Sequence, residues 1–264
     1  MIVESYSAGT PSWVDLMTSD QDSAIDFYAD LFGWQIMRSG PEMGNYAMCM
    51  KNDQPVAGIG PLPDDAPIPA AWTTYIAVDD VDATVALVAD AGGQVIAPAM
   101  TVEGEGQKPG RMAVIADPAG GVFGIWQAMD HKGSGLANEP GAFTWNELMS
   151  RDPQASRDFL AALFGYEWEA MPPMEGMVYH VAKLGDRGVA GVGSMPEQIP
   201  PEVPSFWQAY FAVEDTDDAV ARAVASGATM MAEPFDSPFG RMAVLSDSEG
   251  ASFSVIKLNP DTTG

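Results

Sequence analysis

The stretch that decides the fold is Trp13-Val14-Asp15-Leu16-Met17-Thr18-Ser19-Asp20, because it recurs as Trp145-Asn146-Glu147-Leu148-Met149-Ser150-Arg151-Asp152. Downstream residues repeat in the same order, namely Phe27, Leu31, Phe32 and Gly33 against Phe159, Leu163, Phe164 and Gly165, then 72–80 against 207–215, and 110–114 against 240–244. A period much longer than about 50 residues indicates duplicated domains and not a solenoid. The sequence therefore predicts two homologous halves.

Each half has its own internal pattern of one strand, one helix and several strands. Residues 12–18 alternate as a strand, Asp20 can cap a helix that runs to Leu31, and Gly33 can end it. Short strands are then expected near 34–38, 45–50 and 55–60. A second unit repeats this plan, with a strand at 72–78, a helix from Asp80 to Gly92-Gly93, and strands near 94–97, 111–116 and 122–127. The prediction is an α+β fold with two βαβββ units per half.

The length of 264 residues suits two domains, each large enough for its own core. We place an N-terminal domain at 1–130, a linker at 131–141 and a C-terminal domain at 142–264. The linker is assigned because His131-Lys-Gly-Ser-Gly and Asn138-Glu-Pro-Gly are rich in turn formers.

Charge excludes several classes of partner. The chain has 12 Lys and Arg against 37 Asp and Glu, a formal charge of -25, which repels phosphate backbones and anionic lipid. Neither nucleic acid nor a membrane is therefore an expected partner. The single cysteine, Cys49, cannot form an intrachain disulfide, and the N-terminal residues lack a signal-peptide pattern. We expect a cytoplasmic protein, either a monomer or a homodimer.

Several short motifs carry a family resemblance. They are Ser19-Asp20 before a helix that ends in Phe32-Gly33, then Ala77-Val-Asp-Asp-Val-Asp82, and Asp117-Pro-Ala-Gly120 before a final strand. In these motifs the chain resembles the vicinal-oxygen-chelate superfamily of glyoxalases, bleomycin-resistance proteins and dioxygenases. More narrowly, in the stretches 9–16, 145–148 and 240–247 it is similar to actinobacterial two-domain proteins labelled culture-filtrate antigen or "hydroxylase". The resemblance implies four βαβββ modules in two tandem domains, with curved mixed sheets that form cups for small molecules.

The resemblance also implies where a metal would bind. Metal-dependent members take ligands from the first and last strands of their modules, and here those positions fall on Trp13, Trp145, Thr73, Gln208, Gly124 and Ser254. Indole and glycine cannot ligate a metal, and the chain has only two histidines, His131 and His180. We therefore expect neither a catalytic metal nor another cofactor.

Two acids remain as candidate catalytic residues. Asp15 and Glu147 lie two positions beyond the tryptophans, so they share the same strand face. A carboxyl group beside indole in a water-poor cup has a raised pKa and suits proton transfer. The alternative is a structural role in which the acids pair with backbone amides or with Arg111 and Arg241. His180 is the third catalytic candidate, with an ordinary hydrogen-bonded strand histidine as its alternative.

The expected binding residues are mostly aromatic, because flat ligands suit indole and phenol walls. They are Trp13, Tyr75, Trp126, Trp145 and Tyr210, together with Arg111 and Arg241. The alternative for the aromatic residues is ordinary core packing. Two segments that break the repeat, 98–110 and 171–177, would either cover the cups or be tolerated surface insertions.

These residues lead to a functional hypothesis. We expect a metal-independent lyase or isomerase, dehydratase-like, that acts on an aromatic or carbonyl metabolite, for example in natural-product biosynthesis. The competing hypothesis is a non-catalytic protein that binds or sequesters a small molecule, as resistance proteins do. A third hypothesis, an extracellular antigen, rests on the family label alone.

Overall fold

The computed structural model describes residues 1–63, 68–104, 106–172 and 177–260. The first half contains β1 (Pro11–Thr18), α1 (Gln21–Phe32), β2 (Gln35–Arg38), the short 3-10 helix η1 (Pro41–Met43), β3 (Ala47–Lys51), β4 (Gln54–Pro61), β5 (Ala71–Ala77), α2 (Val81–Val88), β6 (Gln94–Gly104), β7 (Gln107–Ala116) and β8 (Val122–Ala128). The predicted strands and helices are all present, and β6 and β7 are longer than expected.

The second half repeats the same series of elements. It contains β9 (Phe143–Ser150), α3 (Pro153–Phe164), β10 (Glu167–Ala170), β11 (Tyr179–Leu184), β12 (Arg187–Ser194), β13 (Phe206–Ala212), α4 (Thr216–Ala225), β14 (Thr229–Ser237), β15 (Gly240–Ser246) and β16 (Ser252–Leu258). The α+β prediction with two βαβββ units per half is confirmed.

Each half forms one eight-stranded mixed sheet. The strand order is β2-β3-β4-β1-β5-β8-β7-β6 in the first and β10-β11-β12-β9-β13-β16-β15-β14 in the second. The first strands of the two units, β1 and β5, pair antiparallel in the middle of the sheet, and each also pairs in parallel with the last strand of its own unit. A sheet of this kind has one face for helices and one face for a cup.

The repeated aspartates start the helices as predicted. Asp20 and Asp152 each accept a hydrogen bond from the backbone N–H three residues later, at 3.1 Å in both copies. Gly33 and Gly165 end these helices with φ of 69° and 70°, a left-handed conformation that glycine adopts without steric cost.

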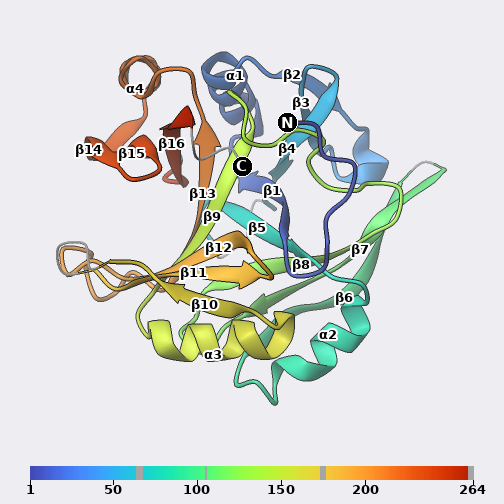
Figure 1. The fold of residues 1–264 in the computed structure, drawn as a ribbon. Helices are drawn as coiled ribbons and strands as arrows, with labels where there is room; N and C mark the ends of the chain where they lie inside the picture. Colours follow the sequence, from blue (N-terminus) through green and yellow to red (C-terminus); the bar gives the residue numbers. More distant parts are fainter. Residues whose placement is uncertain (64–67, 105, 173–176, 261–264) are drawn as a thin grey trace.

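The helices pair across the two halves. Figure 1 shows α1 beside α4 at one end of the molecule and α2 beside α3 at the other, and both pairs are in contact. One core joins α1 residues such as Phe32 to Phe211 and Phe253 of the second half, and the other joins Phe123 to Phe159 and Leu160. Each of the two cores therefore contains residues from both halves, so the expectation of a separate core for each half is wrong.

The predicted linker is packed against the body of the protein. Leu136 is only 2% exposed, and the backbone N–H of Ser134 donates to the carbonyl oxygen of Ser12 at 2.8 Å. His131 lies beside the aromatic side chains of the first sheet. This segment is thus a structural strap between the halves.

The two segments that break the repeat are 98–110 and 171–177. The first is the end of the β6–β7 hairpin, whose Val102 packs against aromatic side chains of the first sheet, while residue 105 lies outside the described residues. Most of the second segment, 173–176, also lies outside them. Among the described residues, no helix is long and apolar enough to span a membrane.

Candidate functional site

The first cup is the sheet face that carries Trp13, Asp15, Tyr46, Tyr75 and Trp126. Strand alternation places Trp13 and Asp15 on this face, while Val14 and Leu16 point into the core with α1. Trp13 Nε1 donates to the Tyr46 hydroxyl at 3.0 Å, and that hydroxyl donates to Asp15 Oδ2 at 3.2 Å. An indole, a phenol and a buried carboxyl group thus form one hydrogen-bonded chain.

Glycines give the phenol rings the space to lie flat on the sheet. Gly58 pairs with Asp15 across the sheet, and a Cβ atom there would lie 1.7 Å from the Tyr46 hydroxyl oxygen. A Cβ atom at Gly124 would likewise lie 2.1 Å from the Tyr75 ring. Because any larger residue would displace these rings, the glycines fix the position of the phenols around Asp15.

Aromatic side chains close the rest of the first cup. Trp13, Tyr75 and Trp126 form one buried cluster, with Met48, Val102 and Met112 packed on it. The His131 imidazole meets the Trp13 ring edge-on, with 4.4 Å between ring centroids, and the Trp126 ring at 5.8 Å. Trp126 Nε1 donates to the His131 carbonyl oxygen at 3.1 Å, which holds the strap against the cup.

The second cup carries Trp145, Glu147, Tyr179 and Tyr210 at the matching positions of the second sheet. Trp145 Nε1 donates to the Tyr179 hydroxyl at 2.8 Å, and this hydroxyl donates to Glu147 Oε2 at 2.7 Å. The Tyr210 hydroxyl donates to Glu147 Oε1 at 2.6 Å. Both carboxylate oxygens of Glu147 therefore have phenol partners.

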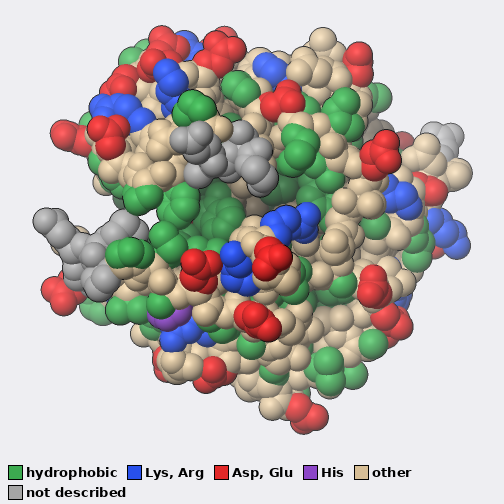
Figure 2. Space-filling model, viewed as in Figure 1, with side chains coloured by type: hydrophobic (Ala, Val, Ile, Leu, Met, Phe, Trp, Pro, Cys, Tyr) green, Lys and Arg blue, Asp and Glu red, His purple; other side chains and the backbone are tan. Residues whose placement is uncertain are grey.

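The second cup is also the more open of the two. Figure 2 shows hydrophobic side chains gathered in a hollow between β14–β16 on one side and β10–β12 on the other. Ile256 occupies the position that Trp126 has in the first half, and Trp145 is partly exposed, whereas Trp13 is buried. The first cup is filled by its own aromatic side chains.

Burial determines the electrostatics of both acids. Removal from water raises the pKa of Asp15 to about 7, against a smaller lowering by the Tyr46 and Tyr75 hydroxyls. Burial raises the pKa of Glu147 as well, opposed by its two phenol hydrogen bonds. Burial and the nearby carboxyl group raise the pKa of Tyr46 and Tyr210, so the phenols stay protonated and act as donors.

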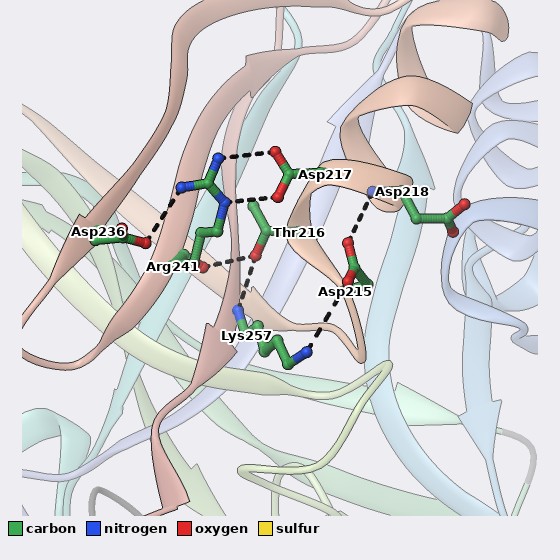
Figure 3. Close-up of polar contacts among 7 residues, drawn as sticks. All are labelled: Asp215, Thr216, Asp217, Asp218, Asp236, Arg241 and Lys257. Atoms are coloured by element: carbon green, nitrogen blue, oxygen red, sulfur yellow. Dashed lines mark hydrogen bonds and ion pairs between the residues drawn. The ribbon is translucent and has the colours of Figure 1, made fainter.

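The predicted arginines lie away from both acids. Arg111 bonds through Nη2 and Nε to the carboxylate of Asp82 at 2.7 and 2.9 Å, on the sheet face opposite Met112. Figure 3 shows the equivalent arrangement, in which Arg241 lies between Asp217, 2.6 Å away, and Asp236, 3.2 Å away. The alternative in which these arginines pair with Asp15 and Glu147 is wrong, because strand alternation turns them toward the helix face.

His180 also lies outside the acid and tyrosine cluster. Its neighbour Tyr179 faces the second cup, so His180 points to the other face, where its Nδ1 lies 3.0 Å from an Arg157 nitrogen. Partial burial, followed by the Arg157 charge, lowers its pKa. This geometry does not bring His180 together with Glu147.

The residues of the cups do not fit a divalent metal. In the first cup the Trp13 indole nitrogen is a hydrogen-bond donor, and Gly124 presents no side chain. In the second cup Gln208 Nε2 donates to Ser254 Oγ at 3.0 Å, so two of the positions implied by the resemblance bond to each other. Within the described residues, no three His, Cys, Asp or Glu side chains converge on one point.

Sequence reasoning missed Tyr46, Tyr179 and His131 as members of the cups. The tyrosines occupy equivalent places immediately before β3 and at the start of β11, and this repetition was a usable signal. No comparable signal pointed to His131, because its counterpart five residues after Ile256 is an aspartate. Its place depends on how the strap packs.

Comparisons with known proteins identify the family. Residues 10–125 match the model of the glyoxalase/bleomycin resistance protein/dioxygenase superfamily, and residues 146–256 match a glyoxalase-like domain. The chain is 46% identical to the Mycobacterium tuberculosis protein "Putative glyoxylase CFP32", covering 97% of both chains. It is 38% identical to anthracycline biosynthesis protein DnrV of Streptomyces peucetius, covering 96% of this chain and 94% of that one.

Solved structures show the same fold at low sequence identity. The Mn(II)-bound glyoxalase from Novosphingobium aromaticivorans has a TM-score of 0.63 at 17% identity, covering 96% of this chain and 83% of that one. The 2,2',3-trihydroxybiphenyl 1,2-dioxygenase from Sphingomonas wittichii has a TM-score of 0.62 at 12% identity, covering 95% and 91%. The chain therefore belongs to the glyoxalase/bleomycin resistance protein/dioxygenase superfamily, as its repeated motifs predicted.

Proposed function

We propose that this protein is a metal-independent lyase or isomerase, dehydratase-like, that moves protons on an aromatic or carbonyl metabolite. The observation that carries the proposal is the buried carboxyl group of Asp15, which accepts a hydrogen bond from Tyr46 on the aromatic face of the first sheet and has a pKa of about 7. A group with such a pKa can accept and return a proton at neutral pH. The relatives named for anthracycline biosynthesis support an aromatic substrate.

In such a reaction Asp15 both accepts and returns the proton. In a dehydration, ionised Asp15 accepts a proton from the carbon next to a carbonyl group, the bond from the adjacent carbon to its hydroxyl breaks, and the hydroxide leaves with that proton as water. In an isomerisation, Asp15 returns the proton to another atom of the substrate. The protonated phenols of Tyr46 and Tyr75 stabilise the carboxylate before it accepts the proton and again after it has returned it.

The assay can use 3-hydroxy-1-tetralone, a β-hydroxy aromatic ketone whose dehydration gives fluorescent 1-naphthol. We expect wild-type protein to accelerate this reaction above buffer and Asp15→Asn to lower the rate by about 100-fold or more, since the amide cannot accept the proton. Asp82→Asn is the matched control, because Asp82 bonds to Arg111 on the other sheet face. An Asp15→Asn protein as fast as wild type would contradict the proposed role.

Metal independence is checked on the same protein. After dialysis against a chelator, elemental mass spectrometry should find no stoichiometric transition metal, and the rate should be unchanged. A rate lost on chelation and restored by one divalent ion would contradict this part of the proposal.

A second candidate function is binding without turnover. It is favoured by the second cup, where the hollow is hydrophobic and both oxygens of Glu147 are occupied by phenols. Saturable binding of aromatic ketones with no product from any of them would support this alternative over the enzyme.

A further inference from the structure

Two buried polar atoms of the first cup have no hydrogen-bond partner within the part of the chain that the structure describes. Among the described residues there are five such side-chain atoms, and two of them, Asp15 Oδ1 and His131 Nε2, belong to this one aromatic cluster. A buried donor or acceptor left without a partner costs about 1–3 kcal/mol, so such atoms are rare in native proteins. Two in one place indicate a missing partner.

Trp13 connects the two atoms. Its indole nitrogen bonds to Tyr46, which bonds to the other oxygen of Asp15, and its ring lies nearly perpendicular to the His131 imidazole at 4.4 Å between centroids. The carboxyl group and the imidazole thus both belong to groups arranged around one indole. A flat molecule against Trp13 would lie close to both unpartnered atoms.

The second cup shows what a completed set of bonds looks like. Glu147 has one more methylene group than Asp15, and its two oxygens reach Tyr179 and Tyr210 at 2.7 and 2.6 Å. The shorter Asp15 accepts from Tyr46 through Oδ2 alone, and Tyr75 acts on it more weakly. The free oxygen is therefore specific to the first cup.

We propose that the first cup binds a flat aromatic ligand with oxygen substituents, one of which bonds to Asp15 Oδ1 and another to His131 Nε2. This assignment rests on the proposed function in taking the cup as the ligand site. A ligand hydroxyl donates to the carboxylate, and the neutral imidazole either donates to a ligand oxygen or accepts from a ligand hydroxyl. His131 is then a ligand-contacting residue that the strap supplies to the first cup only.

The ligand must displace part of the cover of the cup. Trp13, Tyr75 and Trp126 are each 7% exposed or less. The side chains packed on them include Met48 and Met112, which are unbranched and adapt to new shapes at low cost. Ligand binding should therefore move these methionines while the phenols stay on their glycines.

The test compares 1,5-dihydroxynaphthalene with naphthalene, which has the same ring system and no oxygen. Calorimetry on the full-length protein should show at least about tenfold tighter binding of the dihydroxy compound, as expected for hydrogen bonds to buried partners. In carbon-detected imidazole spectra, the His131 signal should shift on binding and the His180 signal should not. With only two histidines in the chain, the two signals are assigned with single variants.

Variants locate the contacts. His131→Gln and Asp15→Asn should each reduce the preference for the dihydroxy compound by about fivefold or more, whereas naphthalene affinity stays within about twofold. His180→Gln is the matched control, since His180 lies on the other face of the other sheet, and thermal melting confirms that each variant is folded. The spectra of the wild-type protein test the contact even where a variant does not fold.

Three results would overturn the assignment. The first is equal affinity for the two compounds, which is the outcome if trapped water already satisfies both atoms. The second is an unshifted His131 signal, and the third is no binding of either compound. If the contacts are found but 3-hydroxy-1-tetralone is not turned over, the ligand site stands and the proposed enzymatic function fails.

Discussion

The two cups are copies of one design that differ in whether the acid is fully hydrogen-bonded. Glu147 lies between two phenol donors in a cup with an open hydrophobic hollow. Asp15 reaches one of its phenols at 3.2 Å and keeps one buried oxygen unpaired in a cup filled with aromatic side chains. The two cups thus differ by the one methylene group that Glu147 has beyond Asp15, and by His131, which only the first cup has. Glu147 has hydrogen bonds on both of its carboxylate oxygens, whereas Asp15 keeps one oxygen available for a ligand or a proton.

The largest expected effect is the loss of folding when the two halves of the protein are separated. A protein ending at residue 130 would expose Phe32 and the α1 surface that packs on Phe211 and Phe253. We expect each half alone to be unfolded or aggregated, because it loses both shared cores, and co-expressed halves to reassociate. Circular dichroism and size-exclusion chromatography of 1–130 and 131–264 would check this, and a monomeric, cooperatively folded half would contradict the shared cores.

The next largest effect is a change in the free energy of unfolding with pH, which Asp15 in the first cup should cause. Asp15 has a folded pKa near 7 against about 4 when unfolded, so the unfolded state releases its proton first as pH rises. Its contribution to folding stability should fall between about pH 4 and 7, by up to about 4 kcal/mol. Asp15→Asn should remove this loss in denaturant titrations, whereas Asp82→Asn should not, because Arg111 lowers the pKa of Asp82.

His131 should produce the opposite slope. Burial lowers its pKa to about 4, so the unfolded state binds the proton first as pH falls. Stability from this residue should be present above about pH 6.5 and lost toward pH 4. His131→Gln should flatten the acid side of the stability profile, and an unchanged acid limb would show that the imidazole is not buried as described.

The smallest effect is expected at the arginines. Arg111→Gln and Arg241→Gln remove exposed ion pairs with helix aspartates, which are weak contacts in water. Turnover and ligand affinity should stay within about twofold of wild type in both variants. A tenfold loss in either would support the substrate-binding role that we predicted for these residues from the sequence.

Much of the fold could be predicted from the repeat. Asp20, Gly33 and their copies fix the ends of α1 and α3 locally, and strand alternation placed Asp15 beside Trp13. The packing of α1 and α3 into cores that contain both halves could not be predicted, since the local sequence around Phe32 and Phe159 would be the same if each half had its own core. Alternation alone also left open which face carries Arg111 and His180, because the register of each strand is set by its partners.

The pKa of the Asp15 side chain is the most direct test of the chemistry proposed for the first cup. Carbon-13 NMR of the aspartate carboxyl signals, with Asp15 assigned from the Asp15→Asn variant, measures it on the full-length protein without any ligand. A titration midpoint near 7 would agree with a buried acid that exchanges protons at neutral pH. A midpoint near 4, as for an exposed aspartate, would contradict the proposed chemistry of the first cup.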